Sequence, residues 1–109
     1  MYNYKVELIK VVDGDTVDLK VDLGFKLFMH ERFRLTGINA PEMRGAEKEA
    51  GKAAKEFLID LLKNRNNKDI VIQTEKQGKY GRWLAIIKVG DSTVNHVMVA
   101  TGHAVYKDY

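Results

Sequence analysis

Hydrophobic and charged residues alternate most regularly between Thr16 and Leu23. The apolar positions of this stretch are Val17, Leu19, Val21 and Leu23. A period of two is typical of a strand that buries one face. Residues 4–12 alternate in part, and the tight-turn dipeptide Asp13-Gly14 lies between the two stretches. The pattern therefore predicts a β-hairpin at the start of the chain.

A third strand is predicted over residues 28–38, where Phe33, Leu35 and Ile38 supply the apolar positions. Gly24 before this stretch and Gly37 near its end favour bends or bulges. Pro41 ends it, because proline lacks the backbone donor that a strand ladder needs.

After Pro41 the hydrophobic period becomes helical. One apolar stripe is expected to contain Ala46, Ala50, Ala53, Ala54, Phe57, Leu58, Leu61 and Leu62. Gly51 interrupts the stripe and costs about 1 kcal/mol relative to alanine in a helix. Close packing against a neighbouring segment is one reason for a glycine at this position.

Two further strands are predicted over residues 69–74 and 83–89, joined by the polar residues 75–82. A short helix follows over residues 94–101, with Val94, Val97 and Met98 facing inward, and then an extended tail. This order suits a mainly β (α+β) fold, a five-stranded OB-fold barrel with a long helix between its third and fourth strands. A mixed α+β sandwich fits the same string of elements.

Length and composition narrow the class of protein. The 109 residues suffice for one domain, expected over residues 1–109, and the net charge of +3 is compatible with a polyanionic partner without requiring one. The absence of cysteine excludes disulfides and thiolate metal sites. No membrane-spanning stretch or signal peptide is visible, so we expect a monomeric cytoplasmic protein if the N-terminus is the natural one.

Several polar residues lie at junctions where phosphate chemistry could be built. Phosphodiester hydrolysis needs cations aimed at the phosphoryl group, a carboxylate to orient water and often a metal ion. Asp13 and Asp15 flank the first turn, and Arg34 should point away from its apolar neighbours, to solvent or into a polar pocket. Taken singly, Asp13 and Asp15 are more commonly residues of a hairpin turn, and a strand arginine such as Arg34 is more commonly solvated. For Trp83, the position at the start of a strand favours a packing role over base stacking.

The order of five short blocks is more specific than any single residue. In sequence these are Val-Val-Asp-Gly-Asp-Thr-Val (11–17), Phe-Arg-Leu (33–35), Gly-Ile-Asn-Ala-Pro-Glu (37–42), Lys-Tyr-Gly-Arg (79–82) and Val-Asn (94–95). Their order and spacing resemble the staphylococcal nuclease family over nearly the whole chain, from about residue 4 to residue 106.

The resemblance implies an OB-fold endonuclease that hydrolyses DNA and RNA at a Ca²⁺-dependent site. It assigns catalytic roles to three residues, with Arg34 and Arg82 holding the phosphate and Glu42 activating the attacking water. The implied metal ligands are Asp15, Asn39 and the carbonyl of Ala40, and the implied nucleotide contacts are Lys79 and Tyr80.

One departure from the family pattern bears on the metal. Asn39 stands where the family has a second aspartate. This exchange lowers the negative charge of the ligand set and the expected affinity for Ca²⁺, so a divalent ion other than Ca²⁺ is also compatible with the site. The same residue supports the alternative of a catalytically weak or silent OB-fold module that binds nucleic acid. A shortened loop after Glu42 also removes part of the family's substrate-contacting surface.

Overall fold

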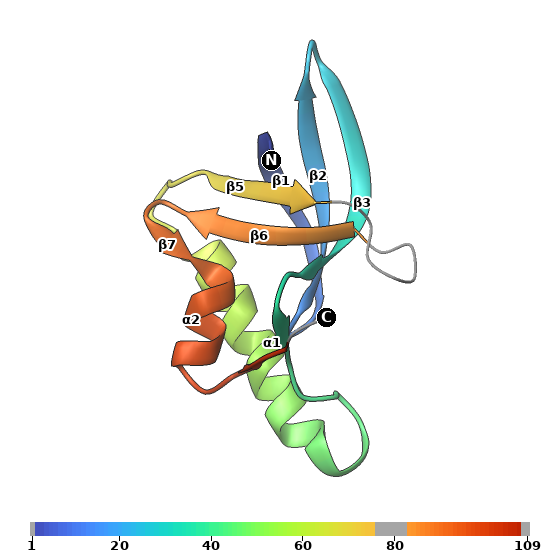
Figure 1. The fold of residues 1–109 in the computed structure, drawn as a ribbon, viewed down its shortest axis with the longest axis vertical. Coiled ribbons are helices and arrows are strands. Elements are labelled where there is room, and N and C mark those ends of the chain that lie inside the picture. Colours follow the sequence, from blue (N-terminus) through green and yellow to red (C-terminus); the bar gives the residue numbers. More distant parts are fainter. Residues whose placement is uncertain (1, 76–82, 108–109) are drawn as a thin grey trace.

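The computed structural model describes residues 2–75 and 83–107, which fold into a barrel with two helices packed against it (Figure 1). Its five long strands run in the order β3-β2-β1-β5-β6, and β6 returns to pair in parallel with β3. This last pairing closes the sheet and confirms the barrel instead of the alternative sandwich. The strands are β1 (Tyr2–Asp13), β2 (Thr16–Gly24), β3 (Leu27–Leu35), β5 (Ile70–Glu75) and β6 (Trp83–Val89).

The alternating pattern of the first hairpin is confirmed inside the barrel. Val17, Leu19 and Val21 have at most 2% of their surface exposed, as the period of two predicts. Leu23 does not continue the buried face and is 43% exposed. The reason is visible in Figure 1, where the β2–β3 hairpin extends beyond the rest of the sheet.

The third predicted strand is two strands. β3 ends at Leu35, and Gly37 adopts a φ of +75°, a conformation that turns the chain out of the sheet. The two-residue β4 (Ile38–Asn39) then pairs with β8 (Val105–Tyr106), so the extended tail returns to the segment that carries Asn39.

The long helix begins with one 3-10 turn, η1 (Gly45–Glu47), and continues as α1 (Lys48–Lys63). Its buried face consists of Gly51, Ala54, Leu58 and Leu62. The predicted stripe was too wide, because Ala46, Ala50 and Ala53 are exposed. They lie in the first half of the helical segment, which extends past the barrel in Figure 1.

The second helix, α2 (Val94–Ala100), follows the short strand β7 (Ser92–Thr93) and buries Val94 and Met98 as expected. Its Asn95 is also buried and connects three segments. The side-chain oxygen of Asn95 accepts from the Ile87 amide over 3.0 Å, and its Nδ2 donates to the carbonyls of Thr36 and Ala85 over 2.9 and 3.1 Å. None of the described helices is long and apolar enough to cross a membrane.

Candidate functional site

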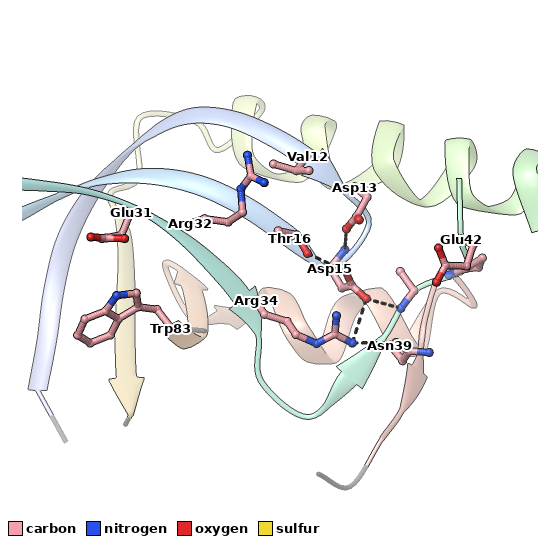
Figure 2. Close-up of a pocket in the computed structure, with 12 residues that line it drawn as sticks. Val12, Asp13, Asp15, Thr16, Glu31, Arg32, Arg34, Asn39, Glu42 and Trp83 are labelled. Atoms are coloured by element: carbon pink, nitrogen blue, oxygen red, sulfur yellow. Dashed lines mark hydrogen bonds and ion pairs between the residues drawn. The ribbon is translucent and has the colours of Figure 1, made fainter. Parts of the chain in front are cut away.

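A cleft of about 680 Å³ lies where the β1–β2 turn, β3, the segment after β4 and the start of β6 meet. The predicted site residues that lie within the described ranges all line it: Asp15, Arg34, Asn39, Ala40 and Glu42. Figure 2 shows Asp15, Arg34, Asn39 and Glu42 around the cleft. The closed barrel therefore brings together three stretches of chain that the sequence separates by up to 27 positions.

Asp15 lies at the base of this cleft and is 5% exposed. Its Oδ1 accepts from the Thr16 hydroxyl over 3.0 Å, and its Oδ2 accepts from the Ala40 amide over 2.9 Å. Its own backbone amide donates to Oδ1 of Asp13 over 3.1 Å. The carboxylate is thereby held between the turn and the segment before Pro41.

Gly14 explains how the turn comes so close to the helix. A Cβ on Gly14 would lie 2.7 Å from the Cβ of Ala54 in α1 and 2.8 Å from the Cβ of Ala40, closer than carbon atoms pack. The glycine is therefore needed for close approach, and Asp15 is positioned by the helix beneath the turn.

Arg34 points into the cleft, the second of the two directions, solvent or a polar pocket, that its apolar neighbours allow. Phe33 and Leu35 are fully buried on the opposite face of β3. Nη2 of Arg34 donates to Oδ1 of Asn39 over 2.8 Å and lies 3.4 Å from Oδ2 of Asp15. The arginine therefore connects the two side chains expected to bind a metal.

The surroundings of Asp15 raise its pKa to about 6, and burial is the largest cause. The hydrogen bond and the charge of Asp13 raise the pKa further, whereas the Ala40 amide and the Arg34 guanidinium favour the ionised form. Carboxylates with a raised pKa that lie in clefts are typical of functional sites. A cation bound beside Asp15 would stabilise the ionised carboxylate that burial disfavours.

Glu42 lies on the rim of the same cleft with its side chain exposed. Its backbone is fixed by α1, because a Cβ on Gly51 would be built into the Glu42 carbonyl group and within 2.9 Å of the Cα of Met43. The expectation that Gly51 allows close packing is confirmed. The helix thus holds the backbone of Glu42 while its carboxylate faces solvent.

The three metal ligands that the resemblance implies would offer one carboxylate, one carboxamide and one backbone carbonyl oxygen, those of Asp15, Asn39 and Ala40, and Asp13 and Glu42 line the same cleft. All are hard donors, which suits Ca²⁺ or Mg²⁺ with water and substrate oxygens completing the coordination. In the part of the chain that the structure describes, there is no group of three or more acidic, histidine or cysteine side chains that could hold a metal. The implied donor set fits a hard cation, and Asp15 supplies its one negative charge.

Three of the predicted site residues, Lys79, Tyr80 and Arg82, lie outside the described residues. The next residue, Trp83, lines the cleft together with Glu31 and Arg32. The sequence favours a packing role for Trp83 and carries no signal that singles out Glu31. Trp83 directly follows the 79–82 block and Glu31 lies two residues before the 33–35 block, but their contribution to one cleft depends on the pairing of β3 with β6.

Comparison with known proteins agrees with this geometry. Residues 32–109 match the profile of the family described as staphylococcal nuclease homologue. Over 103 residues the chain is 33% identical to the thermonuclease of Staphylococcus intermedius, covering 92% of this chain and 58% of that protein. It is 31% identical over 83 residues to protein ParB of Escherichia coli, covering 76% of this chain and 41% of that protein. The chain thus spans about half the length of such curated relatives.

Proposed function

This chain belongs to the staphylococcal nuclease homologue family, and we propose on that basis that it is a metal-dependent endonuclease that hydrolyses phosphodiester bonds of DNA and RNA. One observation carries the proposal: Asp15, Arg34 and Glu42, from three separate segments, line one cleft. A buried carboxylate, a guanidinium and a solvent-facing carboxylate are the groups that hydrolysis of a phosphodiester requires.

Arg34 holds the scissile phosphate in this proposal. Its planar guanidinium can bind two phosphate oxygens at once and offset the charge that develops during water attack at phosphorus. Glu42 accepts the proton of the attacking water, a role that its exposure at the rim supports. By resemblance to the family, Arg82 is the second phosphate-binding arginine, and Lys79 and Tyr80 contact the nucleotide.

Asp15, Asn39 and the Ala40 carbonyl would hold a divalent cation, Ca²⁺ by family resemblance. A cation bound there supplies positive charge to the phosphate oxygens and orients the substrate. Asp15 must be ionised to bind it, and the Oδ1 atom of Asn39, which accepts from Arg34 with one lone pair, would bind the cation with the other or through water.

The contact between Arg34 and Asn39 also favours a second candidate function. An OB-fold module that binds nucleic acid without cleaving it would keep the arginine and would not need a strong metal site. The feature that supports this alternative is Asn39, a carboxamide where the family has a second carboxylate ligand.

A cleavage assay separates the two functions. The protein is incubated with single-stranded and duplex DNA and with RNA, in Ca²⁺, Mg²⁺, Mn²⁺ or chelator. Endonuclease activity predicts metal-dependent cleavage that Arg34→Ala and Glu42→Gln each reduce by about a hundredfold or more. Binding of DNA without cleavage in any metal would establish the silent module instead.

Glu56→Gln is the matched control for Glu42→Gln. Glu56 is an exposed glutamate of α1 outside the cleft, and its substitution removes the same charge. Equal loss of cleavage in the two glutamine variants would contradict the role proposed for Glu42.

A further inference from the structure

The cleft has a second end, away from Asp15, that the proposed reaction does not use. Figure 2 shows Trp83 and Glu31 at this end, whereas Asp15, Asn39 and Glu42 lie at the other. We call the end formed by Trp83, Glu31 and Arg32 the tryptophan end.

Trp83 is held in place by the barrel. It is the first residue of β6 and pairs in parallel with Phe33, the neighbour of Arg34 in β3. The Phe33 and Trp83 rings lie 6.3 Å apart at an angle of 48°, and Phe33 is fully buried beneath. Trp83 itself is only half-buried and lines the cleft. An aromatic ring that packs on a buried partner thus lines the same cleft as Arg34, the proposed phosphate ligand.

The charges of the tryptophan end do not suit a phosphate. Arg32 makes a two-pronged contact with Asp18, with Nε 2.8 Å from Oδ1 and Nη2 3.2 Å from Oδ2, which neutralises its charge. Glu31 adds a carboxylate, which would repel a phosphate but can accept hydrogen bonds from the amino groups of a base. An aromatic surface bordered by a carboxylate suits a nucleobase.

We propose that Trp83 is a stacking platform for the nucleobase next to the phosphate held by Arg34. The proposal rests on the proposed function, since it assumes nucleic acid in this cleft. The faces of a base inside a duplex are covered by its neighbours, so stacking on Trp83 requires the substrate to be single-stranded or opened at this point.

The chain contains one tryptophan, so its fluorescence reports on this position alone. Short single-stranded oligodeoxynucleotides are titrated into the wild-type protein with chelator present to prevent cleavage. Stacking predicts saturable quenching of the tryptophan emission. The dissociation constant obtained from the quenching should equal the one obtained from the fluorescence anisotropy of a labelled oligonucleotide. A duplex of the same sequence should quench much less. In a series of oligonucleotides that each carry one abasic site at a different position, the oligonucleotide that lacks the stacked base should no longer quench the emission.

Variants test the same contact independently. Trp83→Leu should weaken binding of single strands by about 5- to 100-fold, the range expected for the loss of one stacked base. Trp83→Phe should retain most of the affinity, because it keeps an aromatic surface. The matched control is Phe25→Leu, an aromatic substitution at a residue 98% exposed in the turn between β2 and β3, which should leave binding unchanged.

The outcomes distinguish this inference from the proposed function. The stacking platform alone would be overturned by two results together. Binding and cleavage would leave the tryptophan emission of the wild type unchanged, and Trp83→Leu, with its fold confirmed by circular dichroism, would bind and cleave as the wild type does. An absence of both binding and cleavage with every nucleic acid and metal would overturn the platform and the nuclease together.

Discussion

The side-chain oxygen of Asn39 lies 2.8 Å from Nη2 of Arg34, so two residues with separate proposed roles share one hydrogen bond. The same Nη2 lies 3.4 Å from Oδ2 of Asp15. The guanidinium therefore occupies the space between the two side chains proposed to bind the cation. A cation bound between Asp15 and Asn39 would compete with Nη2 of Arg34 for their oxygens, while the other N–H donors of Arg34 remain for a phosphate.

Asn39→Asp should lower the metal concentration needed for half-maximal cleavage by on the order of tenfold. A second carboxylate beside Asp15 raises the charge of the proposed ligand set, and affinity for hard cations follows that charge. The measurement is cleavage of single-stranded DNA over a range of Ca²⁺ concentrations.

The matched control for Asn39→Asp is Asn3→Asp, which introduces the same charge at an exposed position of β1. An unchanged metal requirement in Asn39→Asp would remove Asn39 from the proposed ligand set. An equal change in both variants would attribute the effect to net charge.

Gly51→Ala should destabilise the protein by about 1–3 kcal/mol, although alanine is the better helix former by about 1 kcal/mol. The added Cβ would be built into the Glu42 carbonyl group, so either α1 or the segment after Pro41 must move. Cleavage should fall as well, because Glu42 loses its support. Urea unfolding and cleavage rates measure the two effects.

Ala53→Gly is the control on the exposed face of the same helix. It should cost about 1 kcal/mol through helix propensity alone and leave cleavage unchanged. A Gly51→Ala variant more stable than the wild type would show that the close approach to Glu42 is not needed.

The local features of the fold could be predicted from the sequence because they depend on neighbouring residues. The alternation around Leu19 sets the buried face of β2, and the apolar neighbours of Arg34 set the direction of its side chain. The contact of Gly14 with Ala54 and the place of Trp83 in the cleft could not be predicted in this way. The first depends on how α1 packs against the β1–β2 turn and the second on the parallel register of β3 with β6, and local hydrophobic periods encode neither.

Asn95 shows the same limit, since the sequence marked it as part of a block but gave it no role. Asn95→Asp should destabilise the protein by about 3 kcal/mol or more at pH 7. The oxygen facing the Ile87 amide is kept, but a charged oxygen replaces the group that donates to the carbonyls of Thr36 and Ala85.

The penalty in Asn95→Asp should shrink at pH 4.5, because burial raises the pKa of the new carboxyl and its protonated form can donate again. Urea unfolding at the two pH values is the measurement, with Asn3→Asp as the exposed control. Equal destabilisation at both pH values would show that the loss comes from packing and not from charge.

The raised pKa of Asp15 predicts how the stability of the metal-free protein depends on pH. The carboxyl has a pKa of about 6 in the fold, against an ordinary value of 3.8, so between these values the folded state binds a proton that the unfolded state has lost. The free energy of unfolding should therefore fall as the pH rises from about 4 to about 6, by at most about 1.4 kcal/mol per pH unit. Asp15→Asn, which cannot ionise, should gain stability relative to the wild type over this window.

Two further measurements separate this cause from others. Asp13→Asn removes the negative charge that helps to raise the pKa of Asp15, so the upper edge of the window should move to lower pH. Added Ca²⁺ should stabilise the wild type more at pH 7 than at pH 5, because the cation competes with the proton for Asp15, and should leave Asp15→Asn nearly unchanged. The contradicting result is a stability difference between wild type and Asp15→Asn that stays constant from pH 4 to pH 7. It would show that Asp15 has the same pKa in the folded and unfolded states.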